Sequence, residues 1–370
     1  MQFTSILGIA ALGFLLAACG TDNTSESDIQ PQDSSSAHTA TTQTQDSVLT
    51  LEESWMTERT EADNIDSPAP WHGPNGEHWV IATAKETDML VVYDANTGET
   101  LRRFGKGGTG KGEFDRPNGI AVIDDLVLVV ERDNHRVQAL RLPEFESLGF
   151  IGTDDLRKPY GLTLFKEPSG SYAVYVTDNY ELTEDQIPPD SALGERVRQY
   201  RFSMADGKLQ SELVRTFGET QGPGVLRIVE SIYADPANNR LLVAEEDERE
   251  TCVKVYTLDG SFKDEIIGKG IHHAQTEGIA LYSCNDSTGY WVITDQSHDG
   301  NTFHLYDRAT LKHIGAFTGK VTANTDGVTL TQTGYGDFPS GTFFAVHDDG
   351  GVSSFSWEHI ADGLHVPDCK

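Results

Sequence analysis

The feature that most constrains this chain is a repeated unit of two short β-strands joined by a polar turn. The second strand of each unit carries an aromatic residue or a leucine. These anchors are Tyr93, Leu140, Tyr200, Tyr256, Tyr306 and Phe355, which lie 47, 60, 56, 50 and 49 residues apart. A period near 50 residues built from short strands is typical of the blades of a β-propeller, whereas a β-sandwich would not repeat so regularly.

A further short strand precedes most of the units, and a small residue stands at its head. Glycine there suits the innermost strand of a blade, because backbones approach closely near the propeller axis. These strands are Gly119–Val122, Gly161–Leu164, Ser231–Tyr233, Gly278–Leu281 and Gly327–Leu330. The sequence therefore predicts an all-β fold, a six-bladed β-propeller with four-stranded blades, over residues 51–366.

The N-terminal residues predict export. An apolar run from Ile6 to Ala18 is too short to span a bilayer and ends in Leu16-Ala17-Ala18-Cys19. Small residues before a cysteine are typical of lipoprotein signal peptides, so we expect residues 1–19 to be one, with Cys19 acylated; the alternative is an ordinary signal peptide with a chance cysteine. Residues 20–50, acidic and rich in Ser, Thr and Gln, predict a disordered tether.

These features predict a secreted protein that is lipid-anchored to the cell envelope. Because Gly20 follows the cysteine, the protein is expected to face the outer membrane if the organism is Gram-negative. The chain has 58 acidic and 28 basic residues, a formal net charge of −30. Such a charge repels nucleic acids and anionic membranes, so we expect no nucleic-acid partner and membrane contact only through the lipid anchor. We also expect a monomer.

Three cysteines remain after Cys19, namely Cys252, Cys284 and Cys369. An odd number gives no disulfide framework. Cys252 and Cys284 can pair if their strands are neighbours in an oxidising compartment. The sequence leaves that pairing open and assigns no role to Cys369.

Acidic residues recur where the innermost strands are expected to meet the channel. Glu230 and Glu277 hold the same place in two successive blades, Asp326 holds it in the next, and Glu246 follows a neighbouring strand. Propeller symmetry brings such positions together, and converging carboxylates cannot all stay ionised without a compensating cation. Calcium, with its preference for oxygen ligands, is the natural candidate. The alternative is that these are solvated loop residues of an acidic protein.

Several motifs follow one another along the chain, namely Asp63–Trp71, Glu230 with Ala244-Glu245-Glu246-Asp247, Glu277-Gly278, Thr325-Asp326-Gly327 and Trp357–Asp362. They stand in the order found in the β-propeller phytases, which are alkaline, calcium-dependent enzymes, and the chain resembles that family from about Asp63 to Asp362.

The resemblance implies a calcium-dependent phosphomonoesterase of the 3-phytase type. Such an enzyme hydrolyses myo-inositol hexakisphosphate (phytate) or related phosphorylated small molecules with a water that the metal activates. It implies several calcium ions, held by Asp66, Glu230, Glu246, Glu277 and Asp326. The implied catalytic set is Glu230 with the phosphate-binding residues Lys85, Arg132 and Tyr160.

The chain departs from the family pattern at Ser67, Glu86, Asn179 and Gln275, which replace two acids and two lysines. One segment, Gly107–Val122 with Arg132–Val137, also resembles an NHL repeat, so Arg132 is either a phosphate ligand or a residue that stabilises its blade. The alternative function is a non-catalytic, calcium-stabilised propeller lipoprotein that binds a glycan, a peptide or an envelope partner.

Overall fold

The computed structural model describes residues 48–184, 186–205 and 207–369. The predicted signal peptide and most of the predicted tether lie outside these residues. The tether was expected to reach residue 50, but strand β1 (Leu49–Leu51) already pairs with the propeller, so the folded part begins two residues earlier. Within the described residues, no helix is long and apolar enough to cross a bilayer.

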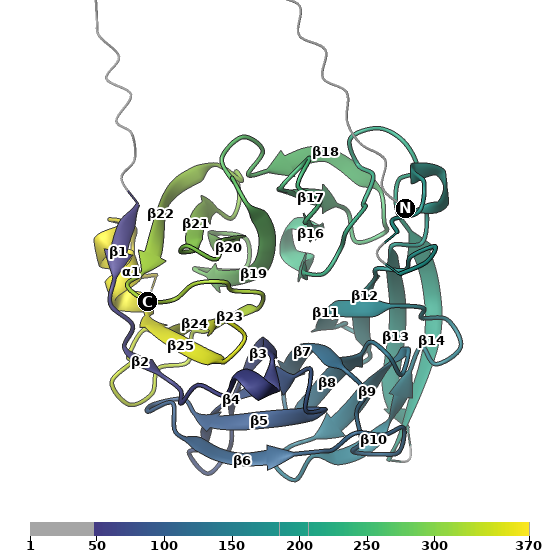
Figure 1. Ribbon diagram of the computed structural model, residues 1–370, viewed down its shortest axis with the longest axis horizontal. Helices are drawn as coiled ribbons and strands as arrows, with labels where there is room; N and C mark the ends of the chain where they lie inside the picture. The colour runs from purple at the N-terminus through teal and green to yellow at the C-terminus, as the bar shows by residue number, and fades with distance from the viewer. Residues whose placement is uncertain (1–47, 185, 206, 370) are drawn as a thin grey trace, which may run out of the picture. The chain divides into compact units, whose positions relative to one another are not determined.

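The fold is a six-bladed β-propeller with four-stranded antiparallel blades, which confirms the prediction. The innermost strands surround the centre in Figure 1, and the outermost strands lie at the periphery. Four of the six small residues that head the innermost strands are glycines, and they are needed for close packing. A Cβ on Gly161 would overlap the carbonyl oxygen of Glu230 in the next blade, and one on Gly327 would overlap that of Asp66. The innermost strands are β3 (Ile65–His72), β7 (Pro117–Ile123), β11 (Pro159–Lys166), β15 (Ile232–Asp235), β19 (Gln275–Ser283) and β23 (Val328–Thr331).

The second and third strands of each blade form its buried centre. The second strands have largely apolar sequences, which agree with burial on both faces. The second strands are β4 (His78–Ala84), β8 (Leu126–Glu131), β12 (Tyr172–Asp178), β16 (Arg240–Glu245), β20 (Gly289–Gln296) and β24 (Thr342–His347). The third strands are β5 (Met89–Asp94), β9 (Arg136–Arg141), β13 (Val197–Ala205), β17 (Cys252–Tyr256), β21 (Thr302–Asp307) and β25 (Gly351–Ser356).

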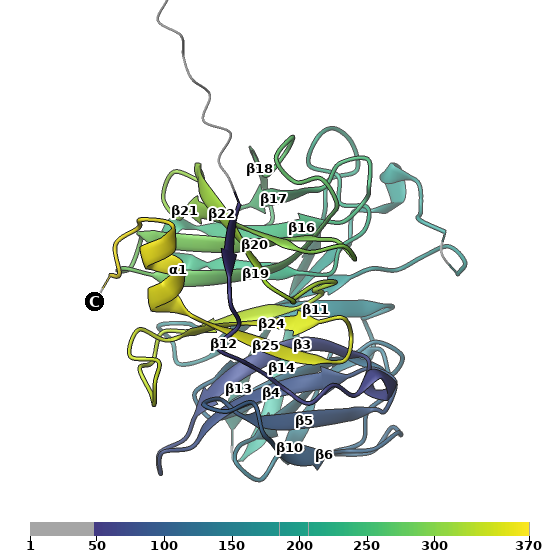
Figure 2. The same cartoon turned by 60° about the vertical axis from the view of Figure 1, so that its left-hand side comes forward.

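The two ends of the described chain close the ring together. The outermost strand of the sixth blade is β2 (Trp55–Met56), which comes from the N-terminal side and pairs with β25. Strand β1 adds to β22 of the fifth blade, beside the C-terminal helix α1 (Trp357–Gly363), as Figure 2 shows. The other outermost strands are β6 (Thr100–Phe104), β10 (Glu146–Ile151), β14 (Lys208–Phe217), β18 (Phe262–Ile267) and β22 (His313–Gly319).

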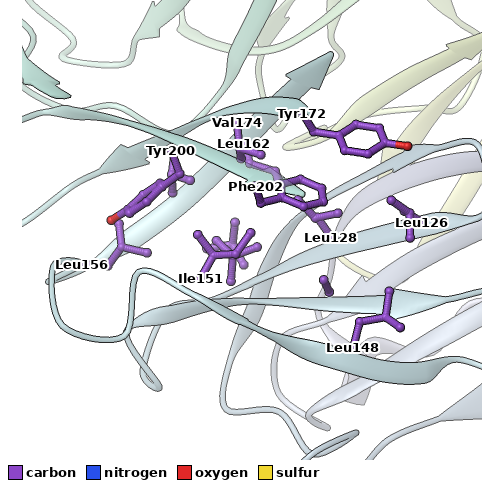
Figure 3. Close-up of a cluster of buried hydrophobic side chains, with 14 residues drawn as sticks. Leu126, Leu128, Leu148, Ile151, Leu156, Leu162, Tyr172, Val174, Tyr200 and Phe202 are labelled. Carbon is purple, nitrogen blue, oxygen red and sulfur yellow. The ribbon is translucent and has the colours of Figure 1, made fainter. Parts of the chain in front are cut away.

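Hydrophobic clusters fill the spaces between neighbouring blades. Figure 3 shows the cluster between the second and third blades, where Leu128 and Ile151 meet Leu162, Val174 and Phe202. Burial of such side chains stabilises the fold by roughly 1.5–3 kcal/mol each. The blades are therefore held face to face, and the loops at their ends are free to carry polar groups.

A disulfide joins Cys284, directly after β19, to Cys369 in the C-terminal tail. The pairing of Cys252 with Cys284 that the sequence left open is therefore wrong. Cys252 is buried and unpaired in β17, where its partner across the sheet is Glu245. Because β17 and β19 belong to different blades, the two cysteines are not on neighbouring strands.

Candidate functional site

Six residues, one from each blade, form a ring at one mouth of the channel. Each of them directly precedes the small residue that heads an innermost strand. The blade geometry explains this ring, because equivalent positions on six radial strands face one axis. Thr177 fixes one of these positions by donating a hydrogen bond of 2.9 Å from Oγ1 to the carbonyl oxygen of Glu230. The ring residues are Asp66, Asn118, Tyr160, Glu230, Glu277 and Asp326.

A second set of side chains lies beside this ring, at the end of the second strand of each blade. The backbone N–H of Lys85 donates to Asn64, and that of Glu246 donates to Ile228, each two residues before the ring residue of its own blade. Lys85, Arg132, Asn179, Glu246 and Gln296 hold this place in the first five blades. The two sets together contain every metal-binding and catalytic residue that the sequence predicted.

Three glutamates of this mouth converge closely. Glu230, Glu246 and Glu277 each offer one carboxylate oxygen, and these oxygens lie within 4.8 Å of one another. Glu246 is 3% exposed and Glu277 is 5% exposed. Among the described residues, Oε1 of Glu246 has no hydrogen-bond partner although it is buried. Such a group lacks the compensation that buried carboxylates normally have, so this arrangement is able to hold a hard divalent cation.

Burial and mutual repulsion shift the acidities of this glutamate triad. Burial raises the pKa of Glu230 to about 8, and the negative charge of Asp66 adds to the rise. Burial also raises the pKa values of Glu246 and Glu277 well above their ordinary range, with the charge of Glu230 as the next cause for both. Without a cation, the triad is thus electrostatically unfavourable in its ionised form.

The other acids of the mouth have a cation of their own. Nζ of Lys85 lies 2.8 Å from Oδ1 of Asp66 and 3.1 Å from Oδ2 of Asp326. Tyr160 donates a hydrogen bond of 3.3 Å from its hydroxyl to Oδ1 of Asp66, and the amide of Gln296 donates to Asp326. Burial alone would lower the pKa of Lys85, but the charges of Asp66 and Asp326 outweigh it and raise that pKa. This lysine is therefore held as a cation.

The channel itself changes character along the axis. A cavity of about 20 Å³ lies at the ring, lined among others by Asp66, Tyr160, Glu230, Glu277 and Asp326. That volume suits one water molecule or one ion. It shares Ser67, Gly161 and Ser231 with a larger cavity of about 410 Å³, which the rest of the innermost strands and Arg308 line. The carboxylates are thus concentrated at the acidic mouth.

The cations around the mouth are paired with acids. Arg132 forms a two-point ion pair with Asp133, with N···O distances of 2.7 and 3.0 Å. Glu86, which replaces a lysine of the family pattern, binds Arg116 in the neighbouring blade. Lys158 likewise pairs with Glu181. Arg132 lies beside the mouth, and its guanidinium is already engaged with Asp133.

Sequence reasoning missed two members of this mouth, Asn118 and Gln296. Asn118 is fully buried at a ring position, and neither polar atom of its amide has a partner among the described residues. Both positions follow from the repeat, since Asn118 precedes Gly119 as Glu277 precedes Gly278. The signal was therefore present in the repeat itself, although neither residue carries a charge.

The fold and the acidic mouth define a six-bladed propeller with a candidate cation site. A family model described as Phytase matches residues 194–365, and a model described as NHL repeat matches residues 114–140. Both predicted resemblances are therefore confirmed over these spans. The Phytase match includes Glu230, Glu246, Glu277 and Asp326, whereas Asp66, Lys85, Arg132 and Tyr160 lie outside it.

No curated protein matches the chain. Among solved structures, one titled "Streptogramin B lyase structure" is 13% identical with a TM-score of 0.46. The match covers 81% of this chain and 96% of that chain. A chain of the structure titled "Crystal structure of Nidogen/Laminin Complex" is 13% identical with a TM-score of 0.45, and the match covers 70% of this chain and 82% of that chain. At this level of similarity neither structure bears on function.

Proposed function

We propose that this protein is a calcium-dependent phosphomonoesterase of the 3-phytase type that acts on phytate or related phosphate esters. The observation that carries the proposal is the triad of Glu230, Glu246 and Glu277, of which the last two are buried, in the span matched by the Phytase model. The triad supplies hard oxygen ligands, and Glu246 retains an unpartnered buried oxygen. These are the groups that a calcium ion would satisfy.

In this proposal the chain's own residues hold and orient the reactants. Glu230, Glu246 and Glu277 would bind calcium, which when bound neutralises charge on phosphoryl oxygens and makes a water more acidic. Tyr160 would keep Asp66 in place through its hydrogen bond. Arg132 would bind a phosphate group at two points after it exchanges Asp133 for the substrate.

Phosphate release tests the proposal. The purified protein should release phosphate from calcium phytate or from an aryl phosphate, and a chelator should abolish the release. Comparison of the two substrates reports how far the paired cations of the mouth limit recognition of a highly charged ester. Absence of release from every ester, with calcium bound, would remove the enzymatic proposal.

A second function has an observation of its own. Because Lys85, Arg132, Arg116 and Lys158 are all paired with acids, the mouth offers little positive charge to a polyanion. A non-catalytic propeller, made rigid by calcium and binding a glycan, a peptide or an envelope partner, agrees with that balance. Calcium binding without phosphate release is its expected signature.

We also propose that the protein works outside the cytoplasm, anchored through lipid on Cys19. The Cys284–Cys369 disulfide supports an oxidising compartment. The lipid on Cys19 lies outside the described residues and stays a prediction. Mass spectrometry of the mature protein should find an acylated cysteine at the N-terminus, and an unmodified terminus elsewhere would contradict it.

A further inference from the structure

The acidic mouth has two halves with different charge balance. In the half formed by the fourth and fifth blades, Glu230, Glu246 and Glu277 converge, and among the described residues no ion pair joins them to a lysine or arginine. In the half formed by the sixth and first blades, Asp66 and Asp326 share the ammonium group of Lys85. Among the described residues, the first half therefore has no ion-paired cation, and the second has Lys85, whose charge also lowers the pKa of Glu230.

The position of Lys85 resembles that of a bound ion. Lys85 directly follows β4, and its side chain is 8% exposed. Its Nζ bridges the carboxylates of Asp66 and Asp326, which belong to two neighbouring blades. An ammonium group offers three donors and one positive charge. Because the side chain is attached to the backbone at the strand end, this cation remains at its position without regard to calcium concentration.

We propose that Lys85 is a built-in counter-ion that takes the place of a metal ion between Asp66 and Asp326, so that the mouth binds one divalent cation, at Glu230, Glu246 and Glu277. This inference rests on the cation site of the proposed function and concerns its number of ions. The family resemblance implies several ions and a phosphate-binding role for Lys85. The ion pairs of Lys85 instead show it bound to Asp66 and Asp326, two of the carboxylates that the resemblance assigns to metal.

Two physical effects support this assignment. A second divalent cation at Asp66 and Asp326 would have to displace a buried ammonium group from both of its partners, which leaves that charge uncompensated. It would also lie close to the cation of the triad, and like charges in a buried site repel strongly. Removal of the Lys85 charge should therefore allow a second divalent cation to bind between Asp66 and Asp326.

Calcium stoichiometry tests the inference in the full chain, measured by native mass spectrometry and calorimetry. The wild type should bind one calcium ion. Lys85→Met, which keeps an unbranched chain without charge, should bind two, and Lys85→Met combined with Asp326→Asn should return to one. The matched control Lys158→Met, at a paired lysine on the rim, should bind one.

The outcomes separate the two proposals. A wild type that binds two or more ions, or a Lys85→Met variant that still binds one, would overturn the role of Lys85 and leave the proposed function standing. A wild type that binds none would remove the cation site and both proposals with it.

A second measurement covers a Lys85→Met variant that does not fold. Acylation of the folded wild type with an amine reagent should leave Lys85 unmodified with or without saturating calcium, whereas exposed Lys111 reacts in both conditions. Lys85 that becomes reactive only when calcium is added would show that metal displaces it, which contradicts the inference.

Discussion

The second and fourth blades carry equivalent glutamates with the same structural task. Glu131 ends β8, is fully buried, and binds Arg136 and Gln138. Glu245 ends β16, is fully buried, and binds Lys254 and the backbone N–H of Arg227 and Ile228. In both blades this acid ties the strand end to the loops around it, so it belongs to the construction of the blade.

The blades differ at the positions that face the mouth. The fourth blade has Glu230 and Glu246 there, whereas the second, which matches the NHL repeat model, has Asn118 and Arg132. Glu245 and Glu246 are neighbours in sequence, yet the first is fully paired and the second keeps an unpartnered oxygen. Pairing, rather than acidity or burial, therefore separates the structural acid Glu245 from the candidate metal ligand Glu246.

The largest expected effect on the free energy of unfolding comes from a substitution of the structural glutamate Glu245. Glu245→Gln removes the charge that compensates Lys254, whose side chain is 0% exposed. Loss of one partner of a buried ion pair costs about 3–5 kcal/mol, and Glu250, the other partner of Lys254, should keep the loss near the lower value. Urea denaturation measures the change.

Glu246→Gln is the matched control at the next residue. It removes a charge that burial and two neighbouring carboxylates disfavour, so the metal-free protein should be as stable as the wild type or more stable. A loss of stability as large as that of Glu245→Gln would erase the distinction between the two glutamates.

Calcium should stabilise the folded protein through the triad. Binding to the folded state alone raises stability by about 2.7 kcal/mol at a hundredfold excess over Kd. Glu230→Gln should lose most of this gain and remain folded, because the amide oxygen brings no charge to the ion. Thermal unfolding in calcium and in chelator measures both proteins, and equal gains in the two would assign the ion elsewhere.

Acid should weaken the fold through a half-buried histidine pair, His72 and His78, at the other end of the first blade. Burial, with the charge of His78, lowers the pKa of His72 to about 4, below its ordinary 6.5. The folded state thus favours neutral His72, so stability is complete above pH 6.5 and falls as the pH drops toward 4. Allowing for partial exposure, the loss is on the order of 2 kcal/mol.

Denaturant unfolding at several pH values checks this slope, and His72→Gln provides the comparison. The variant should lose less stability than the wild type between pH 6.5 and pH 4. His272, whose pKa burial also lowers, to about 3, should leave part of the slope in place. An unchanged slope in His72→Gln would assign the acid sensitivity to other groups.

The smallest effect on stability is expected from a substitution of Asn118, the ring residue of the second blade. Asn118 is buried, and its amide makes no hydrogen bond with the described residues. Asn118→Ala should change stability by less than about 1 kcal/mol, because relief of an unsatisfied polar group offsets the lost packing. A loss comparable to that of Glu245→Gln in the same denaturation assay would give Asn118 a structural role.

Much of the fold could be predicted because each repeat is recognisable from a short stretch of sequence. The anchors Tyr93 to Phe355 gave the period, and small residues such as Gly161 marked the innermost strands. The convergence of Glu230, Glu246 and Glu277 also followed, since propeller symmetry places equivalent residues around one axis.

The features that could not be predicted depend on contacts between distant segments. Strand β2 has only two residues, Trp55 and Met56, too few to carry a strand pattern, and it forms by pairing with β25. The Cys284–Cys369 disulfide joins residues 85 apart through the path of the C-terminal tail. The bridge of Lys85 between Asp66 and Asp326 likewise spans the closure of the ring.

The position of the ion tests the central claim most directly. Crystals grown with calcium, or with a heavier divalent ion in its place, should show an anomalous density peak between Glu230, Glu246 and Glu277. Carboxylate oxygens should lie about 2.3–2.6 Å from a calcium ion at that peak. A peak at another position, or none at saturating calcium, would contradict the assignment of this triad as the metal site.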